Sequence, residues 1–269
     1  MIVHNFDPIL IDLGLFQIRW YSIAYIAGIG LGWMYAIKII KESANNNYNF
    51  IPVKKSDFDD LIIYLVLGVV FGGRLGYVFF YNFNYYSQNF FEILKIWQGG
   101  MSFHGGLLGV IITTFIFSKV KKINFFKFAD IISCVAPIGI FFGRIANFIN
   151  GELYGKISTL PWAVIFPNGE NITRHPSQIY EAILEGILLF VVINYLALKK
   201  HLLFRTSYIS GLFLILYSVL RVFAENFREP DIHLGYFFNY FSLGTLLSLI
   251  SFLAGCFIIF FIKNNEQNN

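Results

Sequence analysis

The chain has 269 residues, of which 57% are hydrophobic and only 13% are charged, and its mean hydropathy is +0.62. A soluble domain carries about 25% charged residues, so this composition excludes an ordinary soluble protein. The formal net charge is +4, and we predict no nucleic-acid partner. Because several spans of about 20 residues would fill the chain, we predict one integral membrane domain over residues 1–269 in a lipid bilayer.

Hydrophobic segments recur along the whole chain. We place them at about 20–40, 59–82, 103–118, 128–147, 178–198, 207–227 and 241–262. The predicted fold class is all-α, a polytopic integral membrane protein with about seven transmembrane helices. The residues before the first segment lack the cationic region of a secretory signal peptide, so we expect that segment to be retained.

The second segment ends in GGRLGYVFFYN, in which Arg74, Tyr77 and Tyr81 share one helix face. The two glycines before Arg74 allow another helix to approach closely. Arg74 is therefore a candidate substrate-binding residue. The alternative is a structural arginine bound to a backbone carbonyl or to Asp60.

The third segment begins with SFHGGLLG, which places His104 at the end of the segment that we expect on the outer side of the membrane. A neutral imidazole, with a pKa of about 6.5, is well suited to accept a proton near neutral pH. The alternative is a capping or interface histidine. Metal binding is not expected, because no second histidine lies three or four residues further on. The cysteines, Cys134 and Cys256, are far apart in apolar segments, so we predict neither a disulfide nor a thiolate metal site.

The fourth segment runs into GRIANFINGELYG, the most polar stretch beside any apolar helix of the chain. An arginine at bilayer depth costs about 2.5–3.5 kcal/mol, so Arg144 indicates a functional site. The alternative is an arginine that snorkels to the interface and anchors the helix end. Asn147 and Glu152 in the next turns favour a site, and a kink at Pro137 is expected to aim Arg144 into a cavity.

The connection after the fourth segment predicts a small extracytoplasmic cap at about 148–177. Within it, WAVIF is typical of a short strand and PNG of a turn. At the start of the fifth segment, Ser177 is expected to cap the helix, and Glu181 to interact with the helix dipole in the first turn.

The sixth segment carries a polar stripe within GLFLILYSVLRVFAENFREPD. Tyr217, Arg221, Glu225 and Arg228 lie on one helix face. Arg221 and Glu225 can form an ion pair that lowers the free-energy cost of burial, which is the structural alternative. If Arg144 and Arg221 both face inward, the net charge of the cavity favours an anion near the outer leaflet.

Basic residues near span ends stay on the cytoplasmic side, so they predict the orientation. Twelve of the 20 basic residues fall on one face: Lys38, Lys41, Lys54, Lys55, Lys119, Lys121, Lys122, Lys127, Lys199, Lys200, Arg205 and Lys263. We predict that this face is cytoplasmic, with the N-terminus outside and the C-terminus inside. Six of the seven arginines lie instead in the segments or on the outer side, where a forked guanidinium suits a phosphate ligand.

Six motifs together carry a resemblance to a known family: RWYSIAYIAG, GGRLGYVFFYN, SFHGGLLG, GRIANFINGELYG, RHPSQIYEA and GLFLILYSVLRVFAENFREPD. Through them the chain resembles the bacterial phosphatidylglycerol–prolipoprotein diacylglyceryl transferases over most of its length. Positions that the family uses are occupied by Tyr21, His104, Arg144, Asn147, Glu152, Gly155, Tyr217, Arg221 and Glu225. Thr245 in SLGTLLS departs from the glutamine expected there.

The resemblance implies transfer of the sn-1,2-diacylglyceryl group from phosphatidylglycerol to the lipobox cysteine thiol of a prolipoprotein signal peptide. A thioether forms and glycerol phosphate is released, as the first step of lipoprotein maturation at the outer face of the bacterial cytoplasmic (inner) membrane. We expect His104 to be the base and Arg144 with Arg221 to bind the phosphate, without cofactor or metal. The expected substrate-binding residues are Tyr21, Arg74, Asn147, Glu152, Gly155, Tyr217 and Glu225.

Two other classes of function remain compatible with arginines inside a helical bundle. One is a transporter of small anions or lipids, in which arginines line a permeation path. Such a path requires polar residues at both depths, whereas here they cluster towards the outer face. The other is a different lipid-headgroup transferase with the same phosphate-binding arginines.

Overall fold

The computed structural model describes residues 2–14, 17–44, 52–229, 236–237 and 241–262. Pro230 and Asp231 of the sixth-segment motif, and Lys263 of the predicted cytoplasmic face, lie outside the described residues. Seven of the described helices are long and apolar enough to cross a membrane: Trp20–Ser43, Lys55–Tyr81, Phe103–Lys121, Phe125–Ile149, Ser177–Lys199, Tyr208–Glu225 and Leu243–Phe260. Each overlaps one predicted segment, so the predicted fold class is confirmed.

The chain forms two compact units. The larger contains Met1–Lys38 and Asp130–Asn269, and the smaller contains Ile39–Ala129. The boundaries fall inside α1 (Trp20–Ala44) and α5 (Phe125–Ile149), so each of these helices contributes to both units. The prediction of a single membrane domain over residues 1–269 stays a prediction.

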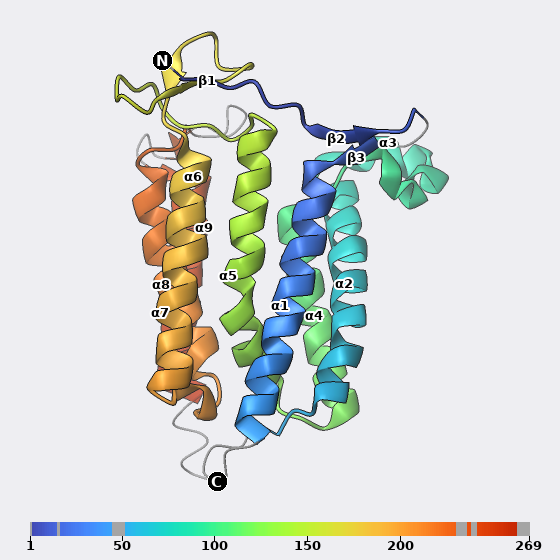
Figure 1. Cartoon of the computed structure of the whole chain (residues 1–269). Coiled ribbons are helices and arrows are strands. Elements are labelled where there is room, and N and C mark those ends of the chain that lie inside the picture. Colours follow the sequence, from blue (N-terminus) through green and yellow to red (C-terminus); the bar gives the residue numbers. More distant parts are fainter. Residues whose placement is uncertain (1, 15–16, 45–51, 230–235, 238–240, 263–269) are drawn as a thin grey trace. The chain divides into compact units, whose positions relative to one another are not determined.

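The larger unit is built mainly from long helices (Figure 1). Besides α1 and α5, a continuous helix spans residues 177–199; it consists of α6 (Ser177–Glu181), the π-helical η3 (Ala182–Leu188), α7 (Leu189–Asn194) and the π-helical η4 (Tyr195–Lys199). The short η5 (Leu202–Phe204) leads to α8 (Tyr208–Glu225). The last helix is α9 (Leu243–Phe257), continued by the π-helical η6 (Ile258–Ile262). The buried apolar side chains of the larger unit include Cys134, which is 0% exposed.

A buried carboxylate fixes where α8 begins. Asp130 of α5 is 1% exposed and accepts hydrogen bonds from the backbone N–H groups of Ser207 and Ser210, both at 2.8 Å. The first N–H groups of a helix have no partner within the helix, and the helix dipole favours a negative charge near them. Asp130 therefore supplies both the acceptor and the charge, and it ties α5 to α8.

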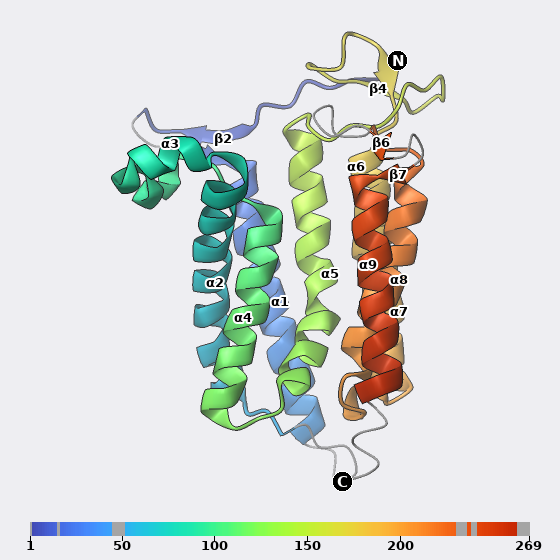
Figure 2. The ribbon, with the colours of Figure 1, turned by 180° about the vertical axis from the view of Figure 1, so that it is seen from behind.

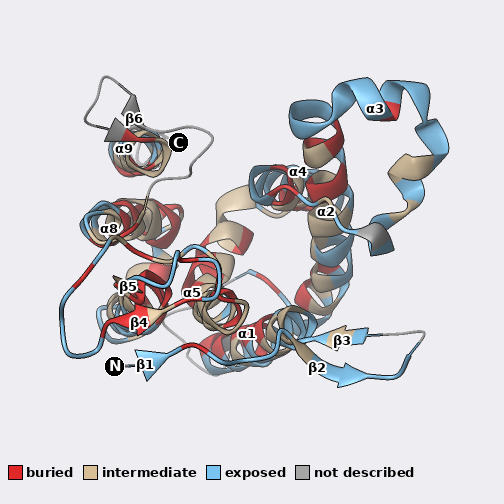
Figure 3. Cartoon of the chain, turned by 90° about the horizontal axis from the view of Figure 1, so that it is seen from above, coloured by how far each residue is buried: buried red, intermediate tan, exposed pale blue. Residues whose placement is uncertain are grey.

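A small cap closes one end of the larger unit. In it, β1 (Ile2–Val3) pairs in parallel with β4 (Val164–Ile165), and β4 pairs in antiparallel with β5 (Thr173–Arg174). Figure 3 shows β4 and β5 beside α5 in the view from above. The strand predicted in WAVIF and the turn at PNG are both confirmed. The side of the membrane on which this cap lies stays a prediction.

Two further hairpins complete the larger unit. The strands β2 (Ile9–Asp12) and β3 (Gln17–Arg19) pair in antiparallel and lead into α1. The short strands β6 (Tyr236–Phe237) and β7 (Phe241–Ser242) pair in antiparallel and lead into α9.

The smaller unit is organised by two glycine-rich helices, α2 (Lys55–Tyr81) and α4 (Phe103–Lys121), which lie side by side (Figure 2). A Cβ atom added at Gly76 of α2 would lie 2.7 Å from the Cα atom of Gly105 in α4. One added at Gly72 would lie 2.9 Å from the Cα atom of Gly109. No real Cβ atom tolerates such distances, so the two backbones approach closely only because these positions lack side chains.

Replacing one of these glycines should weaken the helix pair. We expect Gly76→Ala to destabilise the protein by about 1–3 kcal/mol, because the new methyl group must push two backbones apart. Gly106→Ala is the matched control, since its Cβ would meet its nearest atom at 3.6 Å, an ordinary contact. Thermal unfolding of both variants in detergent checks the prediction, and equal melting temperatures would contradict it.

Between α2 and α4 the chain forms an exposed arm of α3 (Phe83–Gln88), η1 (Phe90–Leu94) and η2 (Ile96–Gln98). Figure 3 shows that most of this arm is exposed. Arg74 of α2, itself 3% exposed, holds the arm at its base. Its guanidinium donates to five backbone carbonyls: those of Ile93 at 2.8 Å, Gly99 at 2.5 Å, Gly100 at 3.2 Å, Glu92 at 2.6 Å and Lys95 at 3.3 Å.

This arrangement bears on the interpretation of Arg74. A guanidinium has five N–H donors, and the arm's carbonyls take all five. These contacts fit the structural alternative, an arginine bound to backbone carbonyls, and the expected role of Arg74 in substrate binding stays a prediction. The sequence could not favour the structural alternative, because these carbonyls belong to an irregular segment 18 to 26 residues further along the chain.

Candidate active site

Three helices of the larger unit turn polar faces towards one another. On α5 the residues are Arg144 and Asn147, one turn apart, and on α8 they are Arg221 and Glu225. The third face is formed by Gln178, Glu181 and Glu185 of α6 and η3, each 0% exposed. Their spacing of three and four residues places them on one side of an otherwise apolar helix.

Arg144 faces the interior of the unit. Its Nη1 lies 2.9 Å from Oε2 of Glu181, and its Nη2 lies 3.0 Å from Oε2 of Glu185. Both carboxylates are 0% exposed, whereas the Arg144 side chain remains 18% exposed. The alternative of an arginine that snorkels away from the protein is therefore excluded, and the predicted inward orientation is confirmed. Pro137 lies inside α5, which continues as a helix on both sides of it, and the kink expected there stays a prediction.

Arg221 reaches the same two carboxylates from the opposite helix. Its Nη1 lies 2.8 Å from Oε1 of Glu181 and 3.4 Å from Oε1 of Glu185. Its Nη2 lies 2.7 Å from Oε2 of Glu225, one turn along α8, so the ion pair that the sequence left open is present. Each of the two buried glutamates thus bridges Arg144 and Arg221.

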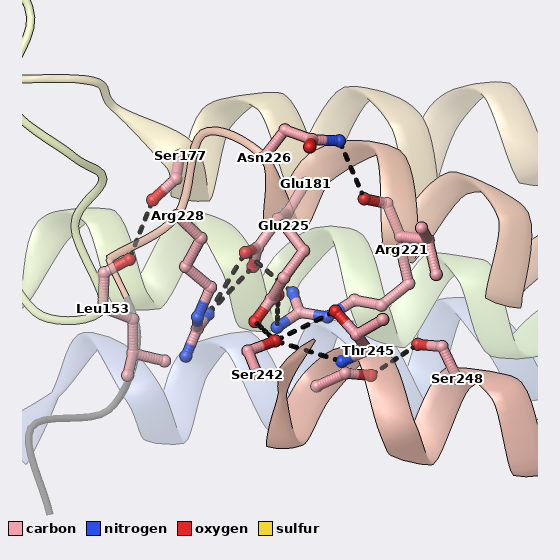
Figure 4. A network of polar contacts seen from close by, with 12 residues as sticks. Leu153, Ser177, Glu181, Arg221, Glu225, Asn226, Arg228, Ser242, Thr245 and Ser248 are labelled. Carbon is pink, nitrogen blue, oxygen red and sulfur yellow. Dashed lines mark hydrogen bonds and ion pairs between the residues drawn. The ribbon is translucent and has the colours of Figure 1, made fainter. Parts of the chain in front are cut away.

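A third arginine joins from the segment that follows α8. Arg228 Nη1 lies 3.1 Å from Oε1 and 3.4 Å from Oε2 of Glu181 (Figure 4). Glu181 therefore contacts three arginines. The sequence predicted for Glu181 only a favourable interaction with the helix dipole, and it did not predict that the side chain is fully buried among arginines. Ser177 does not cap the helix, because its hydroxyl donates to the carbonyl of Leu153 at 2.9 Å.

The formal charges of this cluster cancel. Arg144, Arg221 and Arg228 are matched by Glu181, Glu185 and Glu225 through the ion pairs given above. The expected net positive charge of the cavity is therefore wrong. The physical reason is that charges inside an apolar bundle are stable only when they are paired.

The cluster nevertheless retains donors for a ligand. In the part of the chain that the structure describes, the contacts of Arg144 engage two of the five N–H groups that a guanidinium carries. The arginine side chains keep some exposure, 18% for Arg144 and 10% for Arg221, while Glu181 and Glu185 have none. The two carboxylates are thus fully covered, and of these four side chains only the arginines have surface that a ligand can reach.

A second polar group adjoins Arg144 on the same helix. Asn147 donates from Nδ2 to Oε1 of Glu152 at 2.8 Å and also to the hydroxyl oxygen of Tyr21 in α1. Gln178 donates to the backbone carbonyl of Glu152 at 2.6 Å. The predicted residues Tyr21, Asn147 and Glu152 are therefore brought together, one helical turn from Arg144.

Gly155 lies where the cap and the end of α8 meet. Its N–H donates to the carbonyl of His175 at 2.9 Å, and it forms an antiparallel bridge with Arg228. A Cβ atom here would lie 2.6 Å from the Cβ atom of His175, so only glycine fits. Burial and the nearby Lys156 ammonium lower the pKa of His175, so its ring is neutral at pH 7. The geometry gives Gly155 a structural role, and its predicted contact with substrate stays a prediction.

Comparison with known proteins shows the family of the chain. Residues 8–261 match the family model described as prolipoprotein diacylglyceryl transferase. The chain belongs to the prolipoprotein diacylglyceryl transferase family. It is similar to the phosphatidylglycerol–prolipoprotein diacylglyceryl transferases of Rickettsia bellii (strain OSU 85-389), with 45% identity over 95% of both chains, and of Rickettsia typhi (strain Wilmington), with 46% identity over 96% of this chain and 98% of the relative.

Within this diacylglyceryl transferase, the departure at Thr245 lies beside the cluster. Ser242 caps α9 by accepting a hydrogen bond from the N–H of Thr245 at 3.1 Å, and it donates to Oε1 of Glu225 at 2.7 Å (Figure 4). The Thr245 hydroxyl lies 3.1 Å from that of Ser242. A polar side chain at this position therefore connects to the arginine cluster through Ser242.

The remaining predicted residues of the diacylglyceryl transferase fall in two places. Tyr217 lies one turn before Arg221 on α8, with its ring stacked on Phe213 at a centroid distance of 6.0 Å. His104 is the second residue of α4, and the helix is capped by Ser102, whose hydroxyl accepts a hydrogen bond from the N–H of Gly105. His104 and Arg74 belong to the smaller unit, whereas the other eight predicted residues belong to the larger unit.

Sequence reasoning missed three of the residues that organise the site: Gln178, Glu185 and Ser242. The first two had a usable signal. Gln178, Glu181 and Glu185 repeat at three and four residues within an apolar helix, which is the same pattern that identified Arg221 and Glu225 on α8. Ser242 had no comparable signal, because its role depends on where α9 begins relative to Glu225.

Proposed function

We propose that this protein transfers the sn-1,2-diacylglyceryl group of phosphatidylglycerol to the lipobox cysteine thiol of a prolipoprotein signal peptide, and that Arg144 and Arg221 bind the lipid phosphate. One observation carries the assignment of the site. Two guanidinium groups from α5 and α8 meet at the same pair of fully buried carboxylates, while the two arginine side chains keep some exposed surface. A planar guanidinium binds phosphate oxygens through two parallel hydrogen bonds, which fits this position.

The reaction requires one bond to form and one to break. The cysteine sulfur attacks the C3 carbon of the diacylglyceryl group, a thioether bond forms, and the bond between C3 and the phosphate oxygen breaks. The glycerol phosphate leaves with one more negative charge than the phosphodiester had, unless it takes up the proton of the thiol. Arg144 and Arg221 would stabilise the charge that develops on the departing oxygen.

The polar group beside Arg144 fits the glycerol headgroup. The hydroxyl groups of glycerol both donate and accept hydrogen bonds, and Asn147, Glu152 and Tyr21 offer amide, carboxylate and phenol partners one turn from Arg144. Tyr217 and Glu225 would help to orient the guanidinium of Arg221. We place this site near the outer face of the bacterial cytoplasmic membrane, on the basis of the lysine-rich connections at the opposite helix ends.

His104 is proposed as the base that deprotonates the cysteine. A free thiol has a pKa of about 8.5, so it is mostly protonated at pH 7 and needs an acceptor for its proton. We expect His104→Gln to lower kcat by about 10²–10⁴-fold, the usual contribution of a general base. Peptide lipidation measured from pH 6 to 9 checks this, because the variant should regain activity at high pH as the thiol ionises on its own.

Near-normal turnover of His104→Gln at pH 7 would contradict the base assignment. In that case the arginine cluster would bind the thiolate directly, and the histidine would only position the peptide. Phe103→Leu is the matched control, since it changes the neighbouring residue at the start of α4 without removing a group that accepts protons.

Mass spectrometry of a lipobox peptide tests the proposed function itself. The purified protein is incubated with the peptide in vesicles that contain phosphatidylglycerol. We expect a diacylglyceryl adduct on the cysteine, and none on a peptide with serine in its place or in vesicles of phosphatidylcholine alone. If folded protein gave no adduct with any of several anionic lipids, the function would move to transport or to another headgroup reaction.

A further inference from the structure

Two carboxylates with no exposed surface hold the proposed phosphate-binding arginines together. Glu185 offers one oxygen to each of them, Oε2 to Arg144 at 3.0 Å and Oε1 to Arg221 at 3.4 Å. Glu181 also contacts Arg228, whereas the described ion pairs of Glu185 go only to Arg144 and Arg221. Glu185 is therefore the carboxylate whose contacts are confined to the pair.

The backbone around Glu185 is built for this contact. Glu185 lies in the π-helical segment η3 (Ala182–Leu188), and segments of this kind occur often at functional sites. The next residue, Gly186, faces Phe141 of α5, one turn before Arg144, and a Cβ atom there would lie 2.7 Å from that of Phe141. The close approach of η3 and α5 at Gly186 sets the distance that the Glu185 carboxylate spans.

We infer that Glu185 is a positioning residue for the transfer reaction: it holds Arg144 and Arg221 as one unit and balances their charge. The inference rests on the proposed function of these arginines as the phosphate site. Because Glu185 is fully covered, it touches no substrate and acts only through the two guanidinium groups. Its negative charge opposes the binding of a phosphate, so it also sets how tightly glycerol phosphate is held after the reaction.

The variant Glu185→Gln separates these effects, because it keeps the shape of the side chain and removes its charge. With one counter-charge gone, the pair should bind glycerol phosphate about tenfold more tightly, which corresponds to about 1.4 kcal/mol. The KM for phosphatidylglycerol and kcat should both fall, since product release slows and the arginines are less well oriented. A residue that served only stability would change the yield of folded protein and leave the kcat and KM of that protein unchanged.

Glu229→Gln is the matched control. Glu229 also pairs with an arginine of the larger unit, Arg174 at 3.3 Å, but none of its described ion pairs involves Arg144 or Arg221. We expect this variant to keep the kcat, the KM and the glycerol phosphate affinity of the unchanged protein. Affinity is measured by titration calorimetry with glycerol phosphate, and kcat and KM with the lipobox peptide and phosphatidylglycerol vesicles.

The outcomes separate failure of the inference from failure of the proposed site. Unchanged kcat, KM and affinity in folded Glu185→Gln would overturn the inference, while loss of transfer in Arg144→Ala would still support the arginine site. Full transfer by Arg144→Ala would overturn both. If Glu185→Gln did not fold, Glu185→Asp would be the deciding variant, because it keeps the charge but has a side chain one carbon shorter. Its kcat should fall, and its affinity for glycerol phosphate should not rise. An unchanged kcat would overturn the inference.

Discussion

Arg144→Ala is expected to lower kcat/KM for peptide lipidation by about a thousandfold, the range found when a preorganised charge-stabilising donor is removed. Arg144 is the more exposed of the two arginines that share Glu181 and Glu185, so it is the donor that a lipid phosphate meets first. Arg144→Lys should restore little of the activity. A lysine ammonium is a point charge that cannot bridge two carboxylates and still offer a parallel pair of N–H groups to phosphate.

The measurement is the rate of diacylglyceryl adduct formation on a lipobox peptide, with each variant first shown to be folded. Arg205→Ala is a suitable control, because Arg205 is an arginine of the same unit that lies in the connection after η5. Equal losses in Arg205→Ala and Arg144→Ala would mean that the effect is general. Retained activity in Arg144→Ala would remove the phosphate-binding role from α5.

Glu181→Met is expected to have the largest effect on stability of any single change in the cluster. It removes a fully buried carboxylate that contacts Arg144, Arg221 and Arg228, and leaves one positive charge in excess among the helices. Breaking a buried ion pair on one side costs on the order of 3–5 kcal/mol. Equilibrium unfolding in detergent measures the change in the free energy of unfolding.

A second substitution tests the reason for this loss. The double variant Glu181→Met with Arg228→Met restores formal neutrality, so it should be more stable than Glu181→Met alone. Glu170→Ala is the exposed control: it lies 3.9 Å from Arg174 with 77% of its side chain exposed, so its effect should stay within about 0.5 kcal/mol. A Glu181→Met variant as stable as the unchanged protein would contradict the view that the cluster depends on charge balance.

The sequence was sufficient for the helices because a bilayer permits few solutions. Each membrane span must satisfy its own backbone groups and needs about 20 apolar residues, so hydropathy alone located all seven helices to within a few residues. Arg144, Arg221 and Glu225 were found for a related reason. A charge inside such a helix is rare enough to indicate a site without any knowledge of its partners.

The spacing of Gln178, Glu181 and Glu185 marks a polar face on an apolar helix in the same way, but it does not say which residues that face contacts. Glu185 and Gln178 matter because α5 and α8 face them, and no local pattern says which helices become neighbours. For Arg74 the sequence left two roles open, and it could not identify the carbonyls of the irregular arm as the acceptors that the structure shows. Gly155 was recognised through the family motif, but the need for a glycine arises from the His175 and Phe227 segments that close around it.

The pairing of charges across helices has a consequence for how the chain enters the membrane. A charged side chain opposes the insertion of an isolated membrane helix, and the segment with Arg144 is synthesised before the one with Glu181 and Glu185. Arg144 therefore gains its counter-charges only when the segment 177–199 follows it into the bilayer, and the arginines of α8 complete the set later still. The final fold of the larger unit thus depends on the order in which its helices are inserted during biosynthesis. The charge cluster can form only after α8, the last helix that contributes an arginine, has entered the bilayer.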